Sequence, residues 1–183
     1  MSASHTLIET SLGWIGLAWR GDAVLRLQLP AADRAATERG LVKGLDSTRA
    51  DPLPGWVAAL AERMRRYAQG ERIEFSDVDV ALDGVDPLRR AIYRVLREVG
   101  HGETLTYGEL AERAGFPGEA RMIGQAMGRN PVPLIIPCHR VLAAGRRIGG
   151  FSAPGGATTK QRMLALEGVD LGPAAAAQAA FAF

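Results

Sequence analysis

The side chains best suited to chemistry lie in the segment LIIPCHRVL, residues 134–142, which holds the only cysteine of the chain, Cys138. His139 follows it directly. The thiolate is the reactive form of cysteine and an imidazole can take its proton, so Cys138 is a candidate nucleophile. A lone cysteine in an apolar segment is also commonly a small buried hydrophobe. Neighbours on an extended strand point to opposite faces, so contact between the two side chains would need a turn or a bridging water.

The stretch leading to the cysteine is apolar and β-branched, which predicts a buried strand that Cys138 ends or interrupts. The sequence Asn-Pro-Val-Pro, residues 130–133, precedes it. Its two prolines favour extended backbone and remove two hydrogen-bond donors. Asn130 can hydrogen-bond to nearby backbone, so we expect it to brace the turn that leads to the cysteine.

The segment after the cysteine motif, residues 143–156, is rich in glycine. Glycine lets the backbone approach a ligand closely, although the same composition also suits an ordinary surface loop. Phe151 and Ser152 lie in the middle of this segment. They could supply an apolar wall and a hydroxyl donor to a bound molecule.

Two short helices are predicted before the cysteine segment, over residues 107–114 and 119–128, with a glycine-containing turn between them. Thr106 and Glu109 have the spacing of a capping box at the start of the first helix. Two helices joined by a short turn are typical of a helix-turn-helix, but helical hairpins are also common in proteins that do not bind DNA.

The second of these helices carries an unusual surface. Gly124 and Ala126 are small, and a glycine inside a helix costs about 1 kcal/mol relative to alanine. We therefore expect something to approach this face closely, either another helix or a groove of DNA. Arg121 lies near the helix start, but few other side chains could read base edges. This favours a minor-groove or shape-based contact over major-groove reading.

The other elements are predicted from apolar periodicity and turn residues. Residues 5–29 are expected to form an antiparallel meander of strands. Asp86 and Pro87 suit the cap and first turn of a helix. In chain order, the remaining predictions are a short helix near 31–43, a helix over 54–69, a strand over 72–82, a helix from 86 to 99 and a helix over 158–167.

The chain has 183 residues, of which 47% are hydrophobic, enough to form a substantial core. A linker at residues 82–85 divides it into an N-terminal α/β domain over residues 1–84 and a C-terminal domain over residues 85–170. An alanine-rich tail follows over residues 171–183. Residues 1–85 hold 10 basic and 12 acidic residues, whereas residues 86–169 hold 12 basic and seven acidic ones. The basic second half suits an anionic partner such as nucleic acid.

Several classes of protein are excluded by composition. One cysteine permits no internal disulfide, and three histidines without paired spacing give no metal site. The first residues lack the pattern of a signal peptide, and no stretch approaches the roughly 18 apolar residues of a membrane span. We therefore expect a soluble, cytoplasmic protein that binds neither a membrane nor a metal.

Five local sequences together resemble those of the O6-alkylguanine-DNA alkyltransferases, also called methylated-DNA–protein-cysteine methyltransferases. They occur as an ordered set, which is far more specific than any one of them. The resemblance covers about residues 86–168, and the first half is similar only in size and in the order of strands and helix. The five sequences are Gly102-Glu103-Thr104-Leu105-Thr106-Tyr107, Ala120-Arg121, Asn130-Pro131-Val132-Pro133, Pro137-Cys138-His139-Arg140-Val141 and Leu166-Glu167-Gly168.

The resemblance implies an α/β (α+β) fold, with a ribonuclease-H-like sheet in the N-terminal domain and a winged-helix-like, helix-turn-helix C-terminal domain. Members of the family bind duplex DNA through the minor groove, flip out the damaged base and move its alkyl group irreversibly onto the cysteine. A buried thiol cannot reach a stacked base, so extrusion is physically required. The implied partner is double-stranded DNA containing O6-alkylguanine, bound by a monomer that acts once and needs no cofactor.

The resemblance also implies roles for single residues. Cys138 is the alkyl acceptor, His139 activates it through a water, and Glu167 accepts a hydrogen bond from the other imidazole nitrogen. Tyr107 donates to a guanine ring nitrogen as negative charge develops on the leaving base. Asn130 holds the turn beneath the cysteine.

Further residues are implied to contact DNA or to form the base pocket. Arg121 is expected to fill the space that the flipped base leaves in the stack. The backbone carbonyls of Cys138 and Val141 are expected to accept the exocyclic amine of guanine. The DNA-contacting set is Arg121, Ala120, Gly124, Gln125 and Tyr107, and the pocket set is Pro133, Val141, Phe151 and Ser152.

Two departures from the family pattern have consequences. Many members have tyrosine where this chain has Phe151, so a contact made by that hydroxyl is lost. Some members bind zinc through their N-terminal domain, but this half of the chain has no cysteine and only His5, so no zinc is expected.

Two other functions are weighed against alkyl transfer. One is a lesion sensor that binds alkylated DNA without transfer; non-transferring relatives carry tryptophan in place of the cysteine, which Cys138 argues against. The other is a cysteine hydrolase, an activity that would not explain the basic second half of the chain or the pair of short helices.

Overall fold

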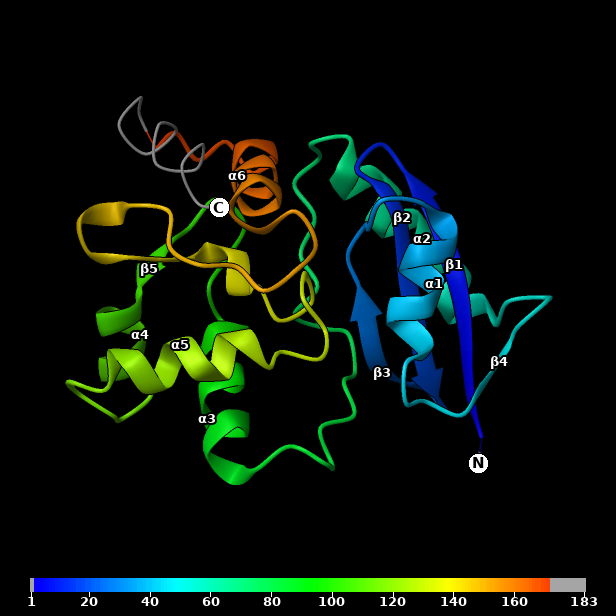
Figure 1. Ribbon diagram of the computed structural model, residues 1–183, viewed down its shortest axis with the longest axis horizontal. Helices are drawn as coiled ribbons and strands as arrows, with labels where there is room; N and C mark the ends of the chain where they lie inside the picture. Colours follow the sequence, from blue (N-terminus) through cyan, green and yellow to red (C-terminus); the bar gives the residue numbers. More distant parts are fainter. Residues whose placement is uncertain (1, 172–183) are drawn as a thin grey trace. The chain divides into compact units, whose positions relative to one another are not determined.

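The computed structural model describes residues 2–171, and these divide into two compact units, each with its own core (Figure 1). One unit runs up to Leu82 and also includes Pro131–Pro133. The other contains Asp83–Asn130 and the chain from Leu134 onward. The division after Leu82 falls in the linker predicted from sequence, whereas the transfer of Pro131–Pro133 to the first unit was not predicted. Most of the predicted tail lies outside the described residues.

The first unit is built on one sheet and two helices. Its elements are β1 (Ala3–Thr10), β2 (Gly13–Arg20), β3 (Ala23–Gln28), α1 (Arg34–Val42), β4 (Ser47–Arg49) and α2 (Gly55–Ala68). The strands lie in the order β3-β2-β1-β4. The predicted antiparallel meander is confirmed, because β1 pairs antiparallel with β2 and β2 pairs antiparallel with β3. The short β4, which was not predicted, pairs parallel with β1.

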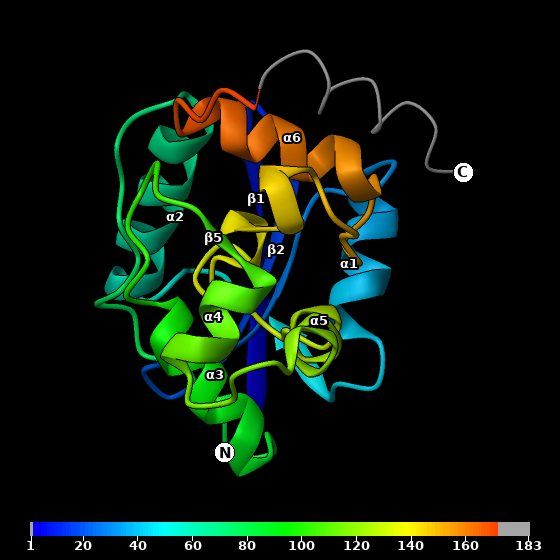
Figure 2. The same ribbon diagram turned by 90° about the vertical axis from the view of Figure 1, so that its left-hand side faces the viewer.

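The two helices of the first unit cover opposite faces of its sheet. Ala18 of β2 packs in a core cluster with Leu41 of α1. The next residue, Trp19, makes an edge-to-face contact with Trp56 of α2, with ring centres 6.1 Å apart. Consecutive strand residues point to opposite faces, so α1 and α2 lie on either side of the sheet, as Figure 2 shows.

The prediction of a strand over residues 72–82 is wrong. Only Val80 forms a bridge, an isolated parallel one with Val24 of β3. The alternation that suggested a strand reflects burial, because Ile73 and Phe75 point into the core. Phe75 packs edge-to-face on Tyr67 of α2, at 5.9 Å between ring centres. The segment therefore buries alternate side chains against a helix without forming a ladder.

The second unit combines short helices with a small parallel pair of strands, β5 and β6 (Figure 1). Its elements are α3 (Pro87–Leu96), β5 (Leu105–Thr106), α4 (Tyr107–Arg113), α5 (Ala120–Gly128), the 3-10 turn η1 (Cys138–Arg140), β6 (Val141–Leu142), the 3-10 turn η2 (Ala144–Arg146) and α6 (Gly156–Leu166). Helix α4 contacts both α3 and α5. None of the helices within the described residues is long and apolar enough to cross a membrane.

Local capping determines where two helices of the second unit, α3 and α4, begin. The Asp86 carboxylate accepts a hydrogen bond from the Arg89 backbone N–H at 2.9 Å, which caps α3. Thr106 and Glu109 form the predicted capping box at the start of α4. These two helices therefore begin close to the expected positions.

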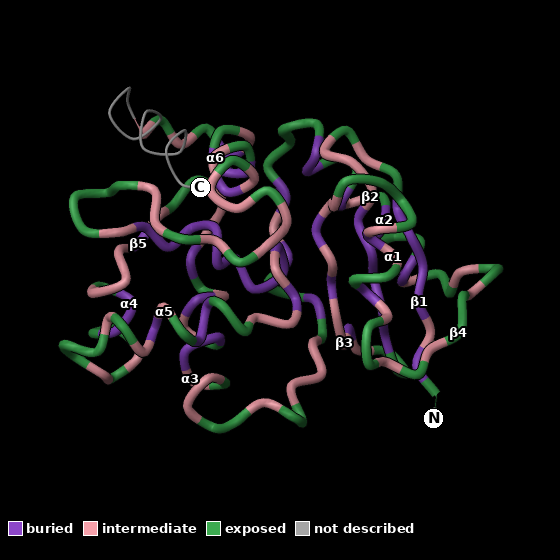
Figure 3. Tube along the Cα trace, in the orientation of Figure 1, coloured by how far each residue is buried: buried purple, intermediate pink, exposed green. Residues whose placement is uncertain are grey.

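The predicted strand before the cysteine is absent, and Cys138 instead begins the turn η1. Prolines at 131, 133 and 137 cannot donate to a ladder, so the segment has few hydrogen bonds to offer a neighbouring strand. Its backbone turns sharply at Leu134, which has a positive φ of 76°. Every residue from 134 to 142 is nevertheless buried, as part of the interior that Figure 3 colours in purple.

Candidate active site

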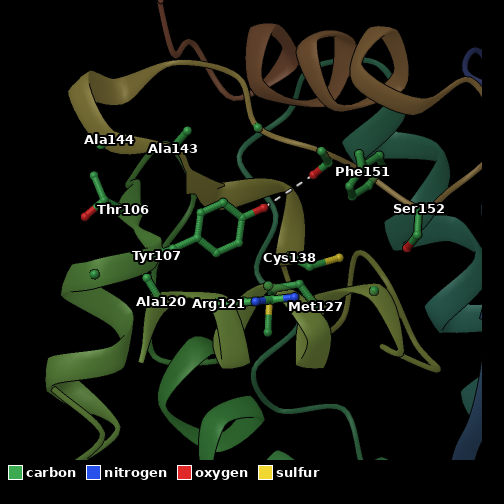
Figure 4. A pocket seen from close by; sticks show the side chains of 15 residues that line it. Thr106, Tyr107, Ala120, Arg121, Met127, Cys138, Ala143, Ala144, Phe151 and Ser152 are labelled. Carbon is green, nitrogen blue, oxygen red and sulfur yellow. Dashed lines mark hydrogen bonds between the residues drawn. The ribbon is translucent and has the colours of Figure 1, made fainter. Parts of the chain in front are cut away.

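A pocket of about 930 Å³ in the second unit lies directly over the only cysteine. Figure 4 shows the Tyr107 ring and the Cys138 thiol pointing toward this space from different elements. The start of α4, one face of α5, the cysteine turn and the glycine-rich loop supply its walls. The lining residues are Thr106, Tyr107, Gly108, Ala120, Arg121, Gly124, Met127, Gly128, Cys138, Ala143, Ala144, Gly149, Gly150, Phe151 and Ser152.

The turn that carries Cys138 is held by the asparagine expected to brace it. The Asn130 side-chain amide donates to the Ile136 carbonyl at 2.8 Å, and the Cys138 N–H donates to the same carbonyl at 2.8 Å. Cys138 is 5% exposed. Burial raises the pKa of its thiol, whereas a hydrogen bond with Asn130 and the charge of Lys160 act in the opposite direction. The thiol therefore needs help to ionise.

His139 is fully buried beside the cysteine and paired with Glu167. Its Nε2 lies 2.7 Å from a carboxylate oxygen of Glu167. Burial lowers the pKa of His139, although the Glu167 carboxylate pulls the other way. The ring is therefore neutral near pH 7, carries its hydrogen on Nε2 toward the carboxylate, and has Nδ1 as its basic nitrogen.

Glu167 lies at the centre of a buried hydrogen-bond network. Arg140 donates to its two oxygens from Nε and Nη2, at 2.9 and 3.0 Å, and the Gly102 N–H donates at 3.1 Å. Burial alone would raise the pKa of Glu167, but the hydrogen bonds from His139 and Arg140 outweigh it and hold that pKa well below its ordinary value. The carboxylate therefore stays ionised and orients the imidazole.

Tyr107 forms one wall of the pocket at the first residue of α4. Its hydroxyl makes a long hydrogen bond of 3.4 Å to the Gly150 carbonyl, drawn dashed in Figure 4. Burial raises the pKa of Tyr107, so the hydroxyl is a proton donor at neutral pH. The loop passes close to the ring, because a Cβ at Gly149 would lie 3.1 Å from a Tyr107 ring carbon. A side chain at position 149 would therefore press on the Tyr107 ring, which would have to shift to make room.

The side of α5 that faces the pocket includes a glycine, which has no side chain. Gly124 lines the pocket, and a Cβ built there would meet no heavy atom within 4 Å among the described residues. Packing against another helix of the described residues therefore does not explain this glycine. Arg121, at the start of α5, is exposed and lines the same pocket.

The structure brings most of the expected residues together and places three elsewhere. Pro133 belongs to the segment grouped with the first unit, Val141 is fully buried in β6, and Gln125 is exposed on α5. None of these three is among the residues that line the pocket. The expected residues that do line it are Tyr107, Ala120, Arg121, Gly124, Cys138, Phe151 and Ser152.

Two buried basic side chains at the site were not assigned a role from the sequence. Arg140 was noted only as part of the cysteine motif, yet it binds both oxygens of Glu167. Lys160 was not noted at all, because its surroundings Thr-Thr-Lys-Gln-Arg resemble an exposed helix start. It is fully buried, and its ammonium group donates to the Val141 carbonyl at 2.5 Å. Nothing in the local sequence signals this burial.

Among the described residues of the first unit, the histidine has a structural role. His5 contacts Ser47 through Nδ1 at 3.0 Å and Glu38 through Nε2 at 3.4 Å, which ties β1 to β4 and α1. Across residues 2–171, no three His, Cys, Asp or Glu side chains gather closely enough to hold a metal ion.

Comparison with known proteins places this site in a defined class. The family model described as "6-O-methylguanine DNA methyltransferase, DNA binding domain" matches residues 87–169, which include every residue around the thiol. The second unit, with its cysteine at the base of an open pocket, is therefore the DNA-binding domain of a protein of this class.

Relatives extend the match over most of the chain. It is 33% identical over 169 residues to the methylated-DNA–protein-cysteine methyltransferase of Mycolicibacterium paratuberculosis, covering 89% of this chain and 91% of the relative. It is 38% identical to the protein of the same name from Mycobacterium tuberculosis, with the same coverage. The crystal structure of M. tuberculosis O6-methylguanine methyltransferase aligns with a TM-score of 0.72 at 30% identity, covering 90% of this chain and 92% of that one. The chain belongs to the methylated-DNA–protein-cysteine methyltransferase family.

Proposed function

We propose that this protein repairs DNA by moving a methyl or other alkyl group from O6-alkylguanine in duplex DNA to Cys138, with O4-alkylthymine as a second candidate substrate. The observation that carries the proposal is the single buried cysteine at the base of the pocket, next to a His139–Glu167 pair at 2.7 Å. The relatives' name supports the activity, and a related M. tuberculosis structure is described as a complex with DNA, at 31% identity and a TM-score of 0.71.

The chemistry begins with ionisation of the thiol. The S–H proton of Cys138 passes through a water to Nδ1 of His139, whose developing charge is compensated by Glu167. The thiolate then attacks the alkyl carbon, the bond from that carbon to O6 breaks, and its electron pair passes to the guanine. Tyr107 donates a proton to the ring as this charge develops and regains one from the imidazolium or solvent. The net proton transfer is therefore from the Cys138 thiol to the guanine base.

Access to the thiol requires that the damaged base leave the duplex. The Gly124 face of α5 has no side chain to obstruct a close approach by DNA, and Arg121 at its start can fill the space left in the stack. In this proposal α4 and α5 act as the helix-turn-helix of a winged-helix-like domain. The first unit serves as a ribonuclease-H-like supporting domain.

The reaction ends with a stable product. Transfer to sulfur gives a thioether, which is not readily hydrolysed, and the chain has no second cysteine that could regenerate the first. Each protein molecule is therefore expected to act once, as a monomer without a cofactor.

Intact-protein mass spectrometry tests the proposal directly. The protein is mixed with a duplex containing one O6-methylguanine, and Cys138→Ser serves as the matched control. The expected result is a gain of one CH2 unit that saturates at one per protein and maps to the Cys138 peptide, with no gain in the control. No gain with the duplex still bound would establish a lesion sensor instead. No gain and no binding would refute both functions.

A further inference from the structure

The outer side of helix α5 combines two glycines with two long polar side chains. Arg121 and Gln125 are both exposed, and residues four apart on a helix share a face. Gly124 and Gly128 lie beside them, and a Cβ built at either glycine would meet no heavy atom within 4 Å among the described residues. Glycine is unfavourable inside a helix, so Gly124 indicates close approach by another molecule. We call Arg121, Gly124, Gln125 and Gly128 the outer strip of α5.

Gln125 is the one residue of the outer strip whose side chain can both donate and accept hydrogen bonds. Its amide has two N–H donors and an acceptor oxygen, whereas the arginine guanidinium only donates. No hydrogen bond joins the Gln125 side chain to another of the described residues. Gln125 is also absent from the lining of the pocket over Cys138. Its amide is therefore available to a partner that covers α5 outside the pocket.

In the proposed function, that partner is the minor groove of the DNA duplex. There, an A·T pair presents only acceptor atoms, whereas a G·C pair adds the N2 amine of guanine as a donor. A glutamine amide matches guanine with two hydrogen bonds, because its oxygen accepts from N2 while its nitrogen donates to N3. At an A·T pair the same oxygen would face acceptors and lose its hydrogen bond. The chemistry of Gln125 therefore favours guanine.

The spacing of Arg121 and Gln125 indicates which base pair would be contacted. An α-helix rises about 1.5 Å per residue, so the two Cα atoms lie about 6 Å apart along the axis. Base pairs are stacked about 3.4 Å apart. With Arg121 in the space left by the flipped base, Gln125 faces a pair one or two steps from the lesion. Gly124 and Gly128 let the backbone of α5 approach the groove closely, so that the amide can reach a base edge.

We propose that Gln125 is a specificity-determining residue, which reads the minor-groove edge of a base pair one or two steps from the lesion and favours guanine there. The proposal rests on the proposed repair of O6-alkylguanine in duplex DNA. It adds a dependence on the neighbouring sequence and assigns that dependence to one hydrogen-bonding group. A lesion beside a suitably placed guanine is therefore repaired faster than the same lesion in A·T-rich sequence.

Removal of a single amine from the DNA tests this contact. Duplexes with one O6-methylguanine carry G·C at one of the four neighbouring positions, one or two steps to either side, and A·T at the others. In a matched set inosine replaces that guanine, which removes only the N2 amine. In another set 2,6-diaminopurine adds the amine to an A·T pair. Transfer is followed as a single-turnover rate, with protein in excess but well below saturation.

Two glutamine variants identify the group that reads the amine. Gln125→Met removes the amide while keeping similar length and helix propensity. Gln69→Met is the matched control, because Gln69 is exposed at the end of α2 in the first unit. Circular dichroism verifies that each variant is folded.

For the unmodified protein, one of the four positions should be sensitive to the amine. Inosine there slows transfer by roughly fivefold or more, and 2,6-diaminopurine accelerates it by a similar factor, the usual scale of a base contact with two hydrogen bonds. Easier base flipping would have the opposite effect, because I·C pairs are weaker than G·C pairs. In Gln125→Met both substitutions change the rate by less than about twofold, since the contact is absent, whereas Gln69→Met keeps the full pattern.

Equal rates with guanine and inosine at all four positions would overturn the proposal. A preference for guanine that persists undiminished in Gln125→Met would overturn it as well, because another group would then read the amine. Absence of transfer from every duplex would instead refute the proposed function. The affinities of the same duplexes for Cys138→Ser, in which the lesion stays intact, would then decide the reading of guanine: equal affinities with guanine and inosine, measured by fluorescence anisotropy, would overturn it.

Discussion

The buried carboxylate of Glu167 offers the sharpest test of how this site is held together. Glu167→Gln preserves size but removes the charge that three donors share, from His139, Arg140 and the Gly102 N–H. Removing one partner of a buried ion pair typically costs roughly 3–5 kcal/mol, because the other charge stays buried and uncompensated. For a chain of this size, about 1 kcal/mol lowers Tm by roughly 2–4 °C. We therefore expect Tm to fall by roughly 6–20 °C.

The assay is urea and thermal unfolding at pH 7, arranged as a double-mutant cycle with Arg140→Met. In the double variant neither member of this ion pair is left buried without the other, so its loss should be smaller than the two single losses combined, with a coupling of about 1–3 kcal/mol. Glu112→Gln is the control: it removes an exposed carboxylate of α4 and should change stability by less than about 0.5 kcal/mol. Additive losses in the cycle would refute the ion-pair argument.

The pH dependence of this stabilisation has a defined sign. The pKa of Glu167 in the folded protein lies below its ordinary value of 4.5, because His139 and Arg140 bind the ionised form. The stabilisation is therefore fully present above about pH 4.5 and is lost as the pH falls through the folded-state pKa. The stability difference between the unmodified protein and Glu167→Gln should be constant from pH 6 to 8 and shrink in acid. A difference that persisted undiminished at pH 2 would contradict this assignment.

Three further predictions concern the pocket. Arg121→Ala should slow transfer from duplex DNA more than the reaction with free O6-benzylguanine, because only the duplex requires flipping; equal losses on both substrates would refute the role in flipping. Tyr107→Phe should lower the single-turnover transfer rate by roughly 10²–10³, the usual cost of one lost donor to developing charge, and a rate within threefold of the original would exclude that donor role. Gly124→Ala should stabilise the protein by up to about 1 kcal/mol in urea unfolding, whereas Gly124→Leu, which adds a large side chain on the pocket-lining surface, should weaken DNA binding measured by fluorescence anisotropy. Unimpaired binding by Gly124→Leu would place DNA elsewhere.

The sequence predicted an element correctly where the interactions that fix its position lie between residues close in the chain. The capping box of Thr106 and Glu109 and the cap of Asp86 act over three residues, so the starts of α4 and α3 could be read directly. The strands of the meander follow from turn residues and apolar runs. Cys138 and its bracing asparagine lie only eight positions apart, and the expected turn between Asn130 and Cys138 is present.

Apolar periodicity predicted strands wrongly in two segments whose side chains are buried but whose backbone forms no ladder with a strand. The segment before Cys138 and the segment over residues 72–82 are both buried or alternately buried, which is the pattern that predicts strands. Prolines remove the donors of the first, and the second packs against α2. An apolar pattern indicates which side chains are buried. A strand also requires a neighbouring strand whose backbone N–H and C=O groups are available for hydrogen bonds.

The sequence by itself predicted most of the local elements, a candidate nucleophile and, through its ordered motifs, the family. Only the tertiary structure decided which distant side chains meet the cysteine. Glu167 reaches His139 across 28 positions, and Lys160 is buried within a stretch whose composition resembles an exposed helix start. The physical reason is that burial and charge pairing depend on which surfaces pack together, and no periodicity within one segment encodes the surface that another segment will bring to it.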